Sequence, residues 1–577
     1  MNRKLLRSVR EYKRESFLTP VFVLLEVLME VLIPLLMANI IDVGIMEGDM
    51  GYIIRMGVLL VVMAILALAL GAKAGQLAAI GSAGYAKNLR HDIFYKIQDF
   101  SFGNIDRFST PGLVTRLTTD ITNVQMAYMF SIRLLSRAPI MIVLSLIMTL
   151  TISVPIAIMM LITIPVLGGV LIFIAKKAHP HFIKVFDEYD ILNNTVQENV
   201  NAARVVKAYV REEHENEKFG RISTVVFKLF TKAEKIVAWN NPVMQFTMYA
   251  VVLVMVLVGG ESIINGSMLT GELTSVIVYA IQILMSLMMV SFVFVMIMIA
   301  EASTDRITEV LDEVPEMEDA EDAITEVPNG DIDFEHVDFS YSGKGGNLSL
   351  KDVNLHIKSG QIIGIIGGTG SAKSTLVQLI PRLYDVTEGS VKVGGIDVRR
   401  YSLKSLRDQV SVVLQKNVLF TGTIYENIRW GDENASDEEV RRVCRLAQAD
   451  GFIEEFPGKY DTMIVEGGNN VSGGQKQRLC IARALLKKPK ILILDDSTSA
   501  VDTRTDALIR QAFREEIPDT TKIIIAQRIS SVEDADMIIV MDNGEINGIG
   551  TSEELLKTNK IYREVYESQV KGGADNE

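Results

Sequence analysis

The sequence contains little cysteine: only Cys444 and Cys480 occur among its 577 residues. Both lie in the C-terminal half, and they do not form a spacing such as C-x-x-C, which metal sites use. We therefore expect neither a disulfide nor a zinc site.

An excess of positive charge is also missing. The chain has 58 Lys and Arg residues against 71 Asp and Glu residues, which gives a net charge of −13. A protein that binds nucleic acid needs a basic surface to displace counterions from the phosphate backbone. The sequence therefore predicts no nucleic-acid partner.

Charged residues are absent from long stretches of the chain. Mean hydropathy is +0.25 and 49% of the residues are hydrophobic, which is too apolar for an ordinary soluble enzyme. A bilayer core about 30 Å thick needs about 20 apolar helical residues. Six segments meet this length, at roughly 17–41, 53–83, 133–153, 155–175, 243–264 and 274–300. The first is too long for the apolar part of a signal peptide, so we expect a retained span.

The distribution of Lys and Arg predicts the orientation of these spans. The loops at 42–52 and 259–273 contain neither residue, whereas the N-terminus and the segments at 85–125 and 176–240 are basic. Basic loops stay on the cytoplasmic side. We therefore expect a multi-pass protein of the cell membrane, in contact with the lipid bilayer, with both termini in the cytoplasm.

The pattern changes after about residue 312. An acidic, proline-punctuated linker is expected over 313–329, and from residue 330 short apolar strands alternate with helical stretches. The predicted fold is an all-α six-helix transmembrane domain over 1–312, fused to an α/β P-loop domain over 330–577.

A phosphate-binding loop is the central motif of this second domain. The segment QIIGIIGGTGSAKSTLVQLI at 361–380 gives an apolar strand, a glycine-rich turn and a helix. Backbone N–H groups of such a turn hold phosphates, the lysine reaches the β and γ oxygens, and the serine ligates Mg²⁺. We predict ATP and Mg²⁺ as cofactors, with the ATP held by Gly367, Thr369, Gly370, Ser371, Ala372, Lys373, Ser374 and Thr375.

Two further residues complete this picture. Asp495 follows the apolar strand KPKILILD and is placed to reach the Mg²⁺ shell together with Ser374. Ala372 replaces the glycine that normally precedes the lysine, and we expect this change to be sterically mild at a helix N-terminus.

The stretch VSGGQKQR at 471–478 resembles the signature motif of ABC transporters. The membrane half is similar to ABC exporters at 104–125 and 197–215, so the resemblance covers nearly the whole chain. It implies a half-transporter that works with a second ABC half-transporter.

The resemblance also implies roles for single residues. Tyr341 would stack on adenine, and Gln415 would sense Mg²⁺ and the intracellular helices; the alternatives are an ordinary strand aromatic and a polar strand-end residue. The signature residues would bind the γ-phosphate of ATP held by the partner, and they are Ser472, Gly473, Gly474 and Gln475. Glu466 and Asp502 would couple the domains, with a solvated loop charge as the alternative for Glu466.

Two residues depart from the family pattern in the catalytic site. Asp496 stands where the family has a glutamate general base, and Gln527 stands where it has a histidine that contacts the γ-phosphate. A retracted carboxylate and an uncharged amide both weaken hydrolysis. We predict the degenerate subunit of a heterodimeric exporter; the alternative is a slow homodimer in which Asp496 is the base.

The substrate is indicated only by the spans. The sixth is rich in methionine, which makes adaptable apolar surfaces, and we predict a multidrug-type exporter of hydrophobic or amphipathic compounds. The alternative is that these methionines face lipid or neighbouring helices. Glu26 and Glu30 share one face of the first span. We predict that they line the pathway and favour cationic amphipathic substrates; the alternative is hydrogen bonding between helices. A dedicated lipid or peptide exporter and an ATP-gated regulatory protein remain as other functions.

Overall fold

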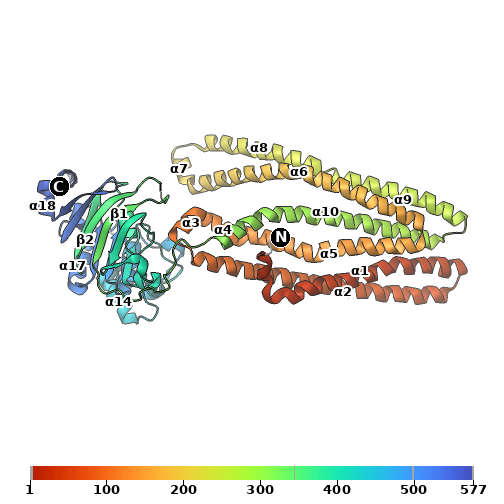
Figure 1. Ribbon diagram of the computed structural model, residues 1–577, viewed down its shortest axis with the longest axis horizontal. Helices are drawn as coiled ribbons and strands as arrows, with labels where there is room; N and C mark the ends of the chain where they lie inside the picture. The colour runs from red at the N-terminus through yellow and green to blue at the C-terminus, as the bar shows by residue number, and fades with distance from the viewer. Residues whose placement is uncertain (1–3, 344, 497–499, 575–577) are drawn as a thin grey trace. The chain divides into compact units, whose positions relative to one another are not determined.

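The computed structural model of the chain describes residues 4–343, 345–496 and 500–574. They form two units, which are shown in Figure 1. The membrane unit contains residues up to 99 and 109–313, and the nucleotide-binding unit contains residues 100–108 and 314 onward.

Long helices make up the membrane unit, because a backbone in lipid must satisfy its own hydrogen bonds. In chain order they are η1 (Leu5–Tyr12), α1 (Lys13–Asn39), η2 (Ile40–Ile45), α2 (Met50–Gln98), α4 (Thr110–Thr115), η3 (Arg116–Asp120), α5 (Ile121–Ile152), α6 (Val154–Asn201), α7 (Ala203–Ala208), α8 (Glu212–Val237), α9 (Asn240–Ile264) and α10 (Thr270–Asp312). Within the described residues, six continuous helical stretches are long and apolar enough to cross a membrane. The predicted six-helix fold is confirmed.

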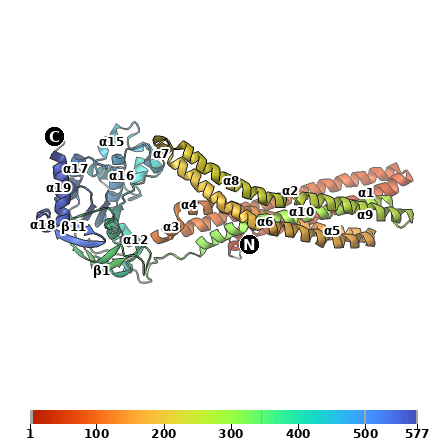
Figure 2. The same ribbon diagram turned by 90° about the horizontal axis from the view of Figure 1, so that it is seen from above.

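These helices pack in pairs. Helix α1 lies along α2, α5 lies along α10, and α6 lies along α8, as Figures 1 and 2 both show. Pro34 interrupts the hydrogen-bond ladder of α1. The hydroxyls of α10 donate to carbonyls near this point, from Ser275 to Pro34 O at 2.6 Å and from Tyr279 to Val31 O at 2.8 Å. Polar contacts of this kind hold α1 against α10 where apolar packing gives no direction.

The nucleotide-binding unit contains two large sheets and a small antiparallel one, in which β7 pairs with β8. One large sheet has the order β2-β1-β4-β5 and is antiparallel, and the other has the order β12-β11-β3-β10-β9-β6. In the second sheet β3, β6, β9, β10 and β11 run parallel. The strands are β1 (Ile332–Phe339), β2 (Leu350–Ile357), β3 (Ile362–Gly367), β4 (Glu388–Val393), β5 (Ile396–Asp397), β6 (Val410–Val413), β7 (Gly422–Thr423), β8 (Met463–Ile464), β9 (Ile491–Asp495), β10 (Thr521–Ile525), β11 (Met537–Asp542) and β12 (Glu545–Gly550).

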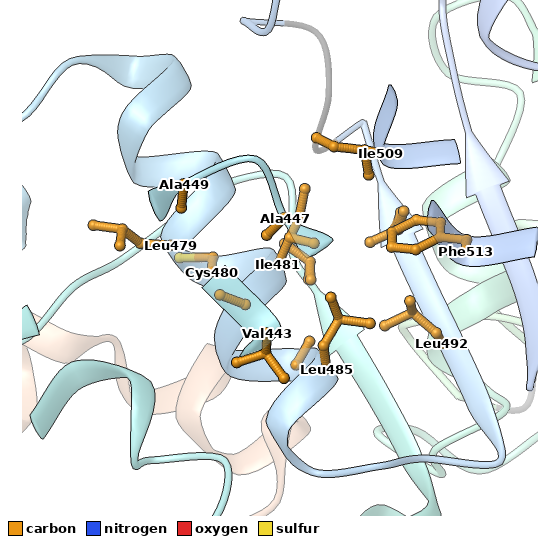
Figure 3. Packing of buried hydrophobic residues seen from close by; sticks show 14 of the residues in the cluster. Val443, Ala447, Ala449, Leu479, Cys480, Ile481, Leu485, Leu492, Ile509 and Phe513 are labelled. Atoms are coloured by element: carbon orange, nitrogen blue, oxygen red, sulfur yellow. The ribbon is translucent and has the colours of Figure 1, made fainter. Parts of the chain in front are cut away.

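Helices also belong to this unit. They are α11 (Lys373–Gln378), α12 (Leu403–Gln409), α13 (Ile424–Ile428), α14 (Asp437–Leu446), α15 (Asp450–Glu455), α16 (Gly473–Leu486), α17 (Thr503–Glu516), α18 (Ser552–Thr558) and α19 (Lys560–Ala574). Figure 3 shows α14, α16 and α17 packing on β9 through Val443, Leu479, Ile481, Leu485, Leu492 and Phe513. Cys444 and Cys480 are free and lie buried in the same core.

Residues 100–108, which include α3 (Phe102–Phe108), belong to the nucleotide-binding unit although they fall inside the predicted 1–312 domain. The Tyr384 hydroxyl donates to Asp106 at 2.8 Å, and Asn104 Nδ2 donates to Val314 O at 3.2 Å. The predicted linker at 313–329 also packs on this unit, where Ile324 bridges to Tyr401. The predicted domain limits remain a sequence-based proposal.

Candidate functional site

The functional side chains of the nucleotide-binding unit gather where β3, β9 and β10 end. Parallel strands bring their carboxyl ends to one edge of a sheet, and ligands bind at that edge. There β3 leads into the phosphate loop, β9 into Asp495 and Asp496, and β10 into Gln527.

The predicted ATP-binding residues lie together in the loop and the first turn of α11. A cavity of about 540 Å³ is lined by Gly370, Ser371, Ala372, Lys373, Ser374 and Thr375. Lys373 Nζ donates to Gly367 O and Gly368 O at 2.8 Å, and burial lowers the pKa of this amine. Lys351 and Asn543 line the same cavity. They were not predicted, because only the tertiary structure brings them to the loop.

The backbone of Ala372 corrects one expectation. Its φ is +69°, in the left-handed region that favours glycine. A side chain in this region costs roughly 1–2 kcal/mol, so replacing the family's glycine with alanine strains the loop and is not sterically mild.

Ala372→Gly is expected to stabilise the nucleotide-binding unit by about 0.5–1 kcal/mol, because relief of strain exceeds the added entropy of the unfolded chain. Thermal unfolding of the purified chain measures the change. Ala512→Gly is the matched control, because Ala512 lies in helix α17 and the same substitution should cost about 1 kcal/mol there. Equal effects at both positions would show that Ala372 is not strained.

The predicted Mg²⁺ ligands are close to one another. Ser374 Oγ donates to Asp495 Oδ1 at 3.0 Å. Burial raises the pKa of Asp495. Gln415 is exposed just after β6, and its amide hydrogen-bonds to Asp496. Hydroxyl, carboxylate and amide oxygens are the hard ligands that Mg²⁺ prefers, so these residues fit the ion.

The two departures from the family pattern contact each other directly. Gln527 Nε2 donates to Asp496 Oδ2 at 2.7 Å. Burial raises the pKa of Asp496, although the amides of Gln527 and Gln415 act in the opposite direction. The carboxylate at the general-base position is therefore buried and already bound to an uncharged amide.

Tyr341 lies beside the phosphate loop. The residue is 52% exposed, and its hydroxyl is 3.0 Å from Thr375 Oγ1. The rings of Phe339 and Tyr384 meet it edge-on. An exposed aromatic ring at this place can stack on a base, which is the predicted role.

The signature residues open α16. Ser472 is the N-cap, its Oγ accepts from Gln475 N at 3.3 Å, and Gln475 Oε1 accepts from Ser472 N at 2.9 Å. A Cβ on Gly474 would lie 2.8 Å from Ala500 O, so glycine is needed for this close approach. The N-terminus of a long helix attracts anions, which agrees with a γ-phosphate ligand.

The two predicted coupling residues have different surroundings. Asp502 is the N-cap of α17 and accepts from Thr505 N at 3.0 Å. This capping role was not predicted from the sequence. Glu466 is exposed in the short turn η6 (Glu466–Gly468). A contact with a second unit remains a prediction for both residues.

The membrane carboxylates have a partner that was not predicted. Arg137 of α5 donates to Glu26 Oε1 at 2.6 Å and to Glu30 Oε2 at 2.5 Å. These bonds favour the alternative of interhelical hydrogen bonding. The sequence could have indicated this ion pair, because Arg137 lies inside the third predicted span and a charge within the membrane normally has a counter-charge.

Comparisons with known proteins agree with this geometry. The family model for the ABC transporter transmembrane region matches residues 16–287, and the ABC transporter model matches residues 350–499. YfiB of Bacillus subtilis, described as an uncharacterized ABC transporter ATP-binding protein, is 37% identical over 566 residues and 98% of each chain. The ATP-dependent lipid A-core flippase of Desulfotalea psychrophila is 33% identical over 484 residues and 84% of each chain.

A solved structure shares the fold. A bacterial Atm1-family ABC exporter with ATP bound has a TM-score of 0.86 and 22% identity, over 96% of this chain and 99% of that one. The predictions of a fused transmembrane and nucleotide-binding architecture and of a transport ATPase are confirmed. The chain belongs to the ABC transporters: it is a multi-pass membrane protein that binds ATP and has the fold of an exporter half-transporter.

Proposed function

We propose that this chain is the degenerate-site subunit of a heterodimeric, multidrug-type exporter in the cell membrane, with both termini in the cytoplasm. It would move hydrophobic or amphipathic compounds out of the cytoplasm or the inner leaflet. The observation that supports this most is the 2.7 Å hydrogen bond between Asp496 and Gln527, because it joins both departures from the family's catalytic pattern.

The chain's own residues explain tight binding with slow hydrolysis. The phosphate loop and Lys373 hold the ATP phosphates, and Tyr341 holds the adenine. Mg²⁺ would be held by Ser374, Gln415 and Asp495, and when bound it neutralises phosphate charge. Asp496 is the residue left to orient and deprotonate water. Its carboxylate is retracted by about 1.5 Å relative to glutamate, and such a displacement costs on the order of 100-fold.

The signature motif supports the other half of the proposal. Its capping box and glycines are intact, so Ser472 can complete a site on the partner. This chain would therefore help the partner to hydrolyse ATP while retaining its own nucleotide.

Ser472→Asp is expected to lower ATP hydrolysis by the two-subunit complex about 100-fold, because the carboxylate repels the partner-held γ-phosphate. Aspartate caps a helix as well as serine does, so α16 should still fold. ATP turnover of the complex purified through a tag on this chain measures the effect.

The matched control is Ser436→Asp at the N-cap of α14, which carries the same kind of capping box. Unchanged turnover in the Ser472 variant would contradict the proposed role. The same purification identifies the partner: a second half-transporter with Glu and His at the two positions supports the heterodimer. Recovery of this chain alone would favour the homodimer with Asp496 as base.

A lipid exporter is the second candidate, because a relative with 33% identity is described as a lipid A-core flippase. ATP-dependent movement of a fluorescent lipid, compared with that of a cationic dye in inverted vesicles, separates the two substrates. Vesicles in which ATP changes conductance without net uptake would favour the ATP-gated alternative.

A further inference from the structure

One side chain near the end of α19 makes two hydrogen bonds to the segment that carries Gln527. Gln569 Nε2 donates to Gln527 O at 2.8 Å, and Gln569 Oε1 accepts from Ile529 N at 2.9 Å. A single amide therefore uses its donor and its acceptor on two backbone groups of the same short loop. The bonded groups belong to residues i and i+2, so the amide fixes the backbone between them.

The helix that presents Gln569 is itself anchored. Tyr562 is fully buried, its hydroxyl is 2.9 Å from Ser552 Oγ, and its N–H donates to Asn559 at 2.9 Å. Val565 and Tyr566 pack against the core under the parallel sheet. Gln569 lies about two helical turns beyond Tyr562, so its position is set by a fixed support.

The loop between β10 and η7 (Ile529–Ser531) is also hydrogen-bonded where it leaves the sheet. Ala526 N donates to Ile365 O at 3.3 Å, which holds the loop at its start. Gln527 follows at once, and its side chain reaches Asp496 Oδ2. The carbonyl that accepts from Gln569 belongs to Gln527 as well. The two hydrogen bonds of Gln569, which we call the clamp, therefore hold the backbone of the residue whose side chain contacts Asp496.

The far side of the loop is tied to α17 and the segment before it. Arg528 donates to Val501 O at 3.4 Å, and Ser531 Oγ donates to Asp506 Oδ2 at 2.9 Å. Asp506 is 3% exposed, so this second tie is buried. Gln569 of α19 bonds to the loop from the opposite side, so the loop is held between α17 and α19.

We propose that Gln569 is a positioning residue for ATP hydrolysis: it holds the backbone of Gln527 and thereby sets the distance between Gln527 and Asp496. The inference rests on the proposed roles of these two residues in the site. Both hydrogen bonds of the Gln569 amide go to backbone groups of the loop, so Gln569 acts through the loop and is not a catalytic residue.

Amide hydrogen exchange of the full-length chain tests the clamp without reference to catalysis. In Gln569→Ala, the Ile529 N–H is expected to exchange about five- to ten-fold faster, because it loses its acceptor. Gln511→Ala is the matched control, because Gln511 bonds only to Glu515 on the exposed face of α17 among the contacts described. Unchanged exchange at Ile529 would overturn the inference.

Single-turnover hydrolysis of labelled ATP tests the positioning role. We choose this measurement because it can determine the slow rate expected at this site. Gln569→Ala is expected to lower the rate constant about ten-fold and to leave ATP affinity unchanged. In a Gln527→Ala background the same substitution should change the rate less than two-fold. Equal losses in both backgrounds would show that Gln569 does not act through Gln527.

These outcomes are separate from those of the proposed function. The effect of Gln569 is measured as the ratio of two rate constants, with and without this side chain. This ratio can be determined whether the native rate of hydrolysis is slow or fast. A fast native rate contradicts the degenerate site alone, and unchanged exchange contradicts the clamp alone.

Discussion

Arg137→Met is expected to lower the free energy of unfolding of the membrane unit by about 3–5 kcal/mol. Arg137 is the bridge between two carboxylates of α1, and the side chain of Glu26 is 11% exposed. Removing one partner of a buried pair leaves an uncompensated charge, which costs more than the pair contributes.

A matched control is available one helical turn away. The guanidinium of Arg133 lies near Gly75, and within residues 4–343, 345–496 and 500–574 it forms no ion pair, so Arg133→Met should cost less than about 1 kcal/mol. Adding Glu26→Gln and Glu30→Gln to Arg137→Met should restore most of the loss, because no charge then remains.

Fluorescence can follow the membrane unit alone. The chain has two tryptophans, Trp239 in the membrane unit and Trp430 in the nucleotide-binding unit. In a Trp430→Phe background, denaturant unfolding in detergent reports on Trp239. If Arg137→Met and Arg133→Met destabilise equally, the ion pairs do not support the fold.

The triple variant also tests the predicted substrate pathway. Glu26→Gln and Glu30→Gln alone would leave Arg137 unpaired and destabilise the fold. A loss of transport in that variant could then result from unfolding. In the neutral triple variant, unchanged transport of cationic dyes would remove both carboxylates from the pathway. A selective loss of cationic over neutral substrates would support them.

The second large effect concerns the nucleotide site. Asp496→Glu combined with Gln527→His is expected to raise ATP hydrolysis at this chain's own site about 100-fold. The longer side chain moves the carboxylate outward by about 1.5 Å, to within reach of water. Histidine can add a positive charge that glutamine cannot carry.

Single-turnover measurements on the purified chain check this result. Lys373→Ala in the same background should remove the gained activity, which excludes a contaminating ATPase, because the lysine holds the transferred phosphate. Asp496→Asn should lower the native rate further if Asp496 is a slow base. A brisk native rate, or no gain in the double variant, would falsify the degenerate-site proposal.

Much of the fold follows from local sequence. Each span could be predicted because a helix needs about 20 apolar residues to cross the bilayer, and a single segment can satisfy its own backbone hydrogen bonds there only as a helix. The phosphate loop could be predicted because its glycines, Lys373 and Ser374 are adjacent in the chain. The signature motif is also contiguous, and its capping box is a short-range pattern.

The remaining contacts join residues that are far apart in the chain. Arg137 is more than one hundred residues from Glu26, and Gln569 is 42 residues from Gln527. Neither pairing has a sequence period that could reveal it. The strained φ of Ala372 is likewise a property of the loop's path and not of the residue.

The sequence by itself therefore determined the architecture, the ATP-binding loop and the two departures at Asp496 and Gln527, because these depend on composition and on neighbouring residues. Only the tertiary structure decided that the two departures bond to each other, that α19 holds their loop, and that Glu26 and Glu30 already share a cation. Side chains from separate elements meet only after the sheet and the helix pairs have packed, so their contacts are consequences of folding.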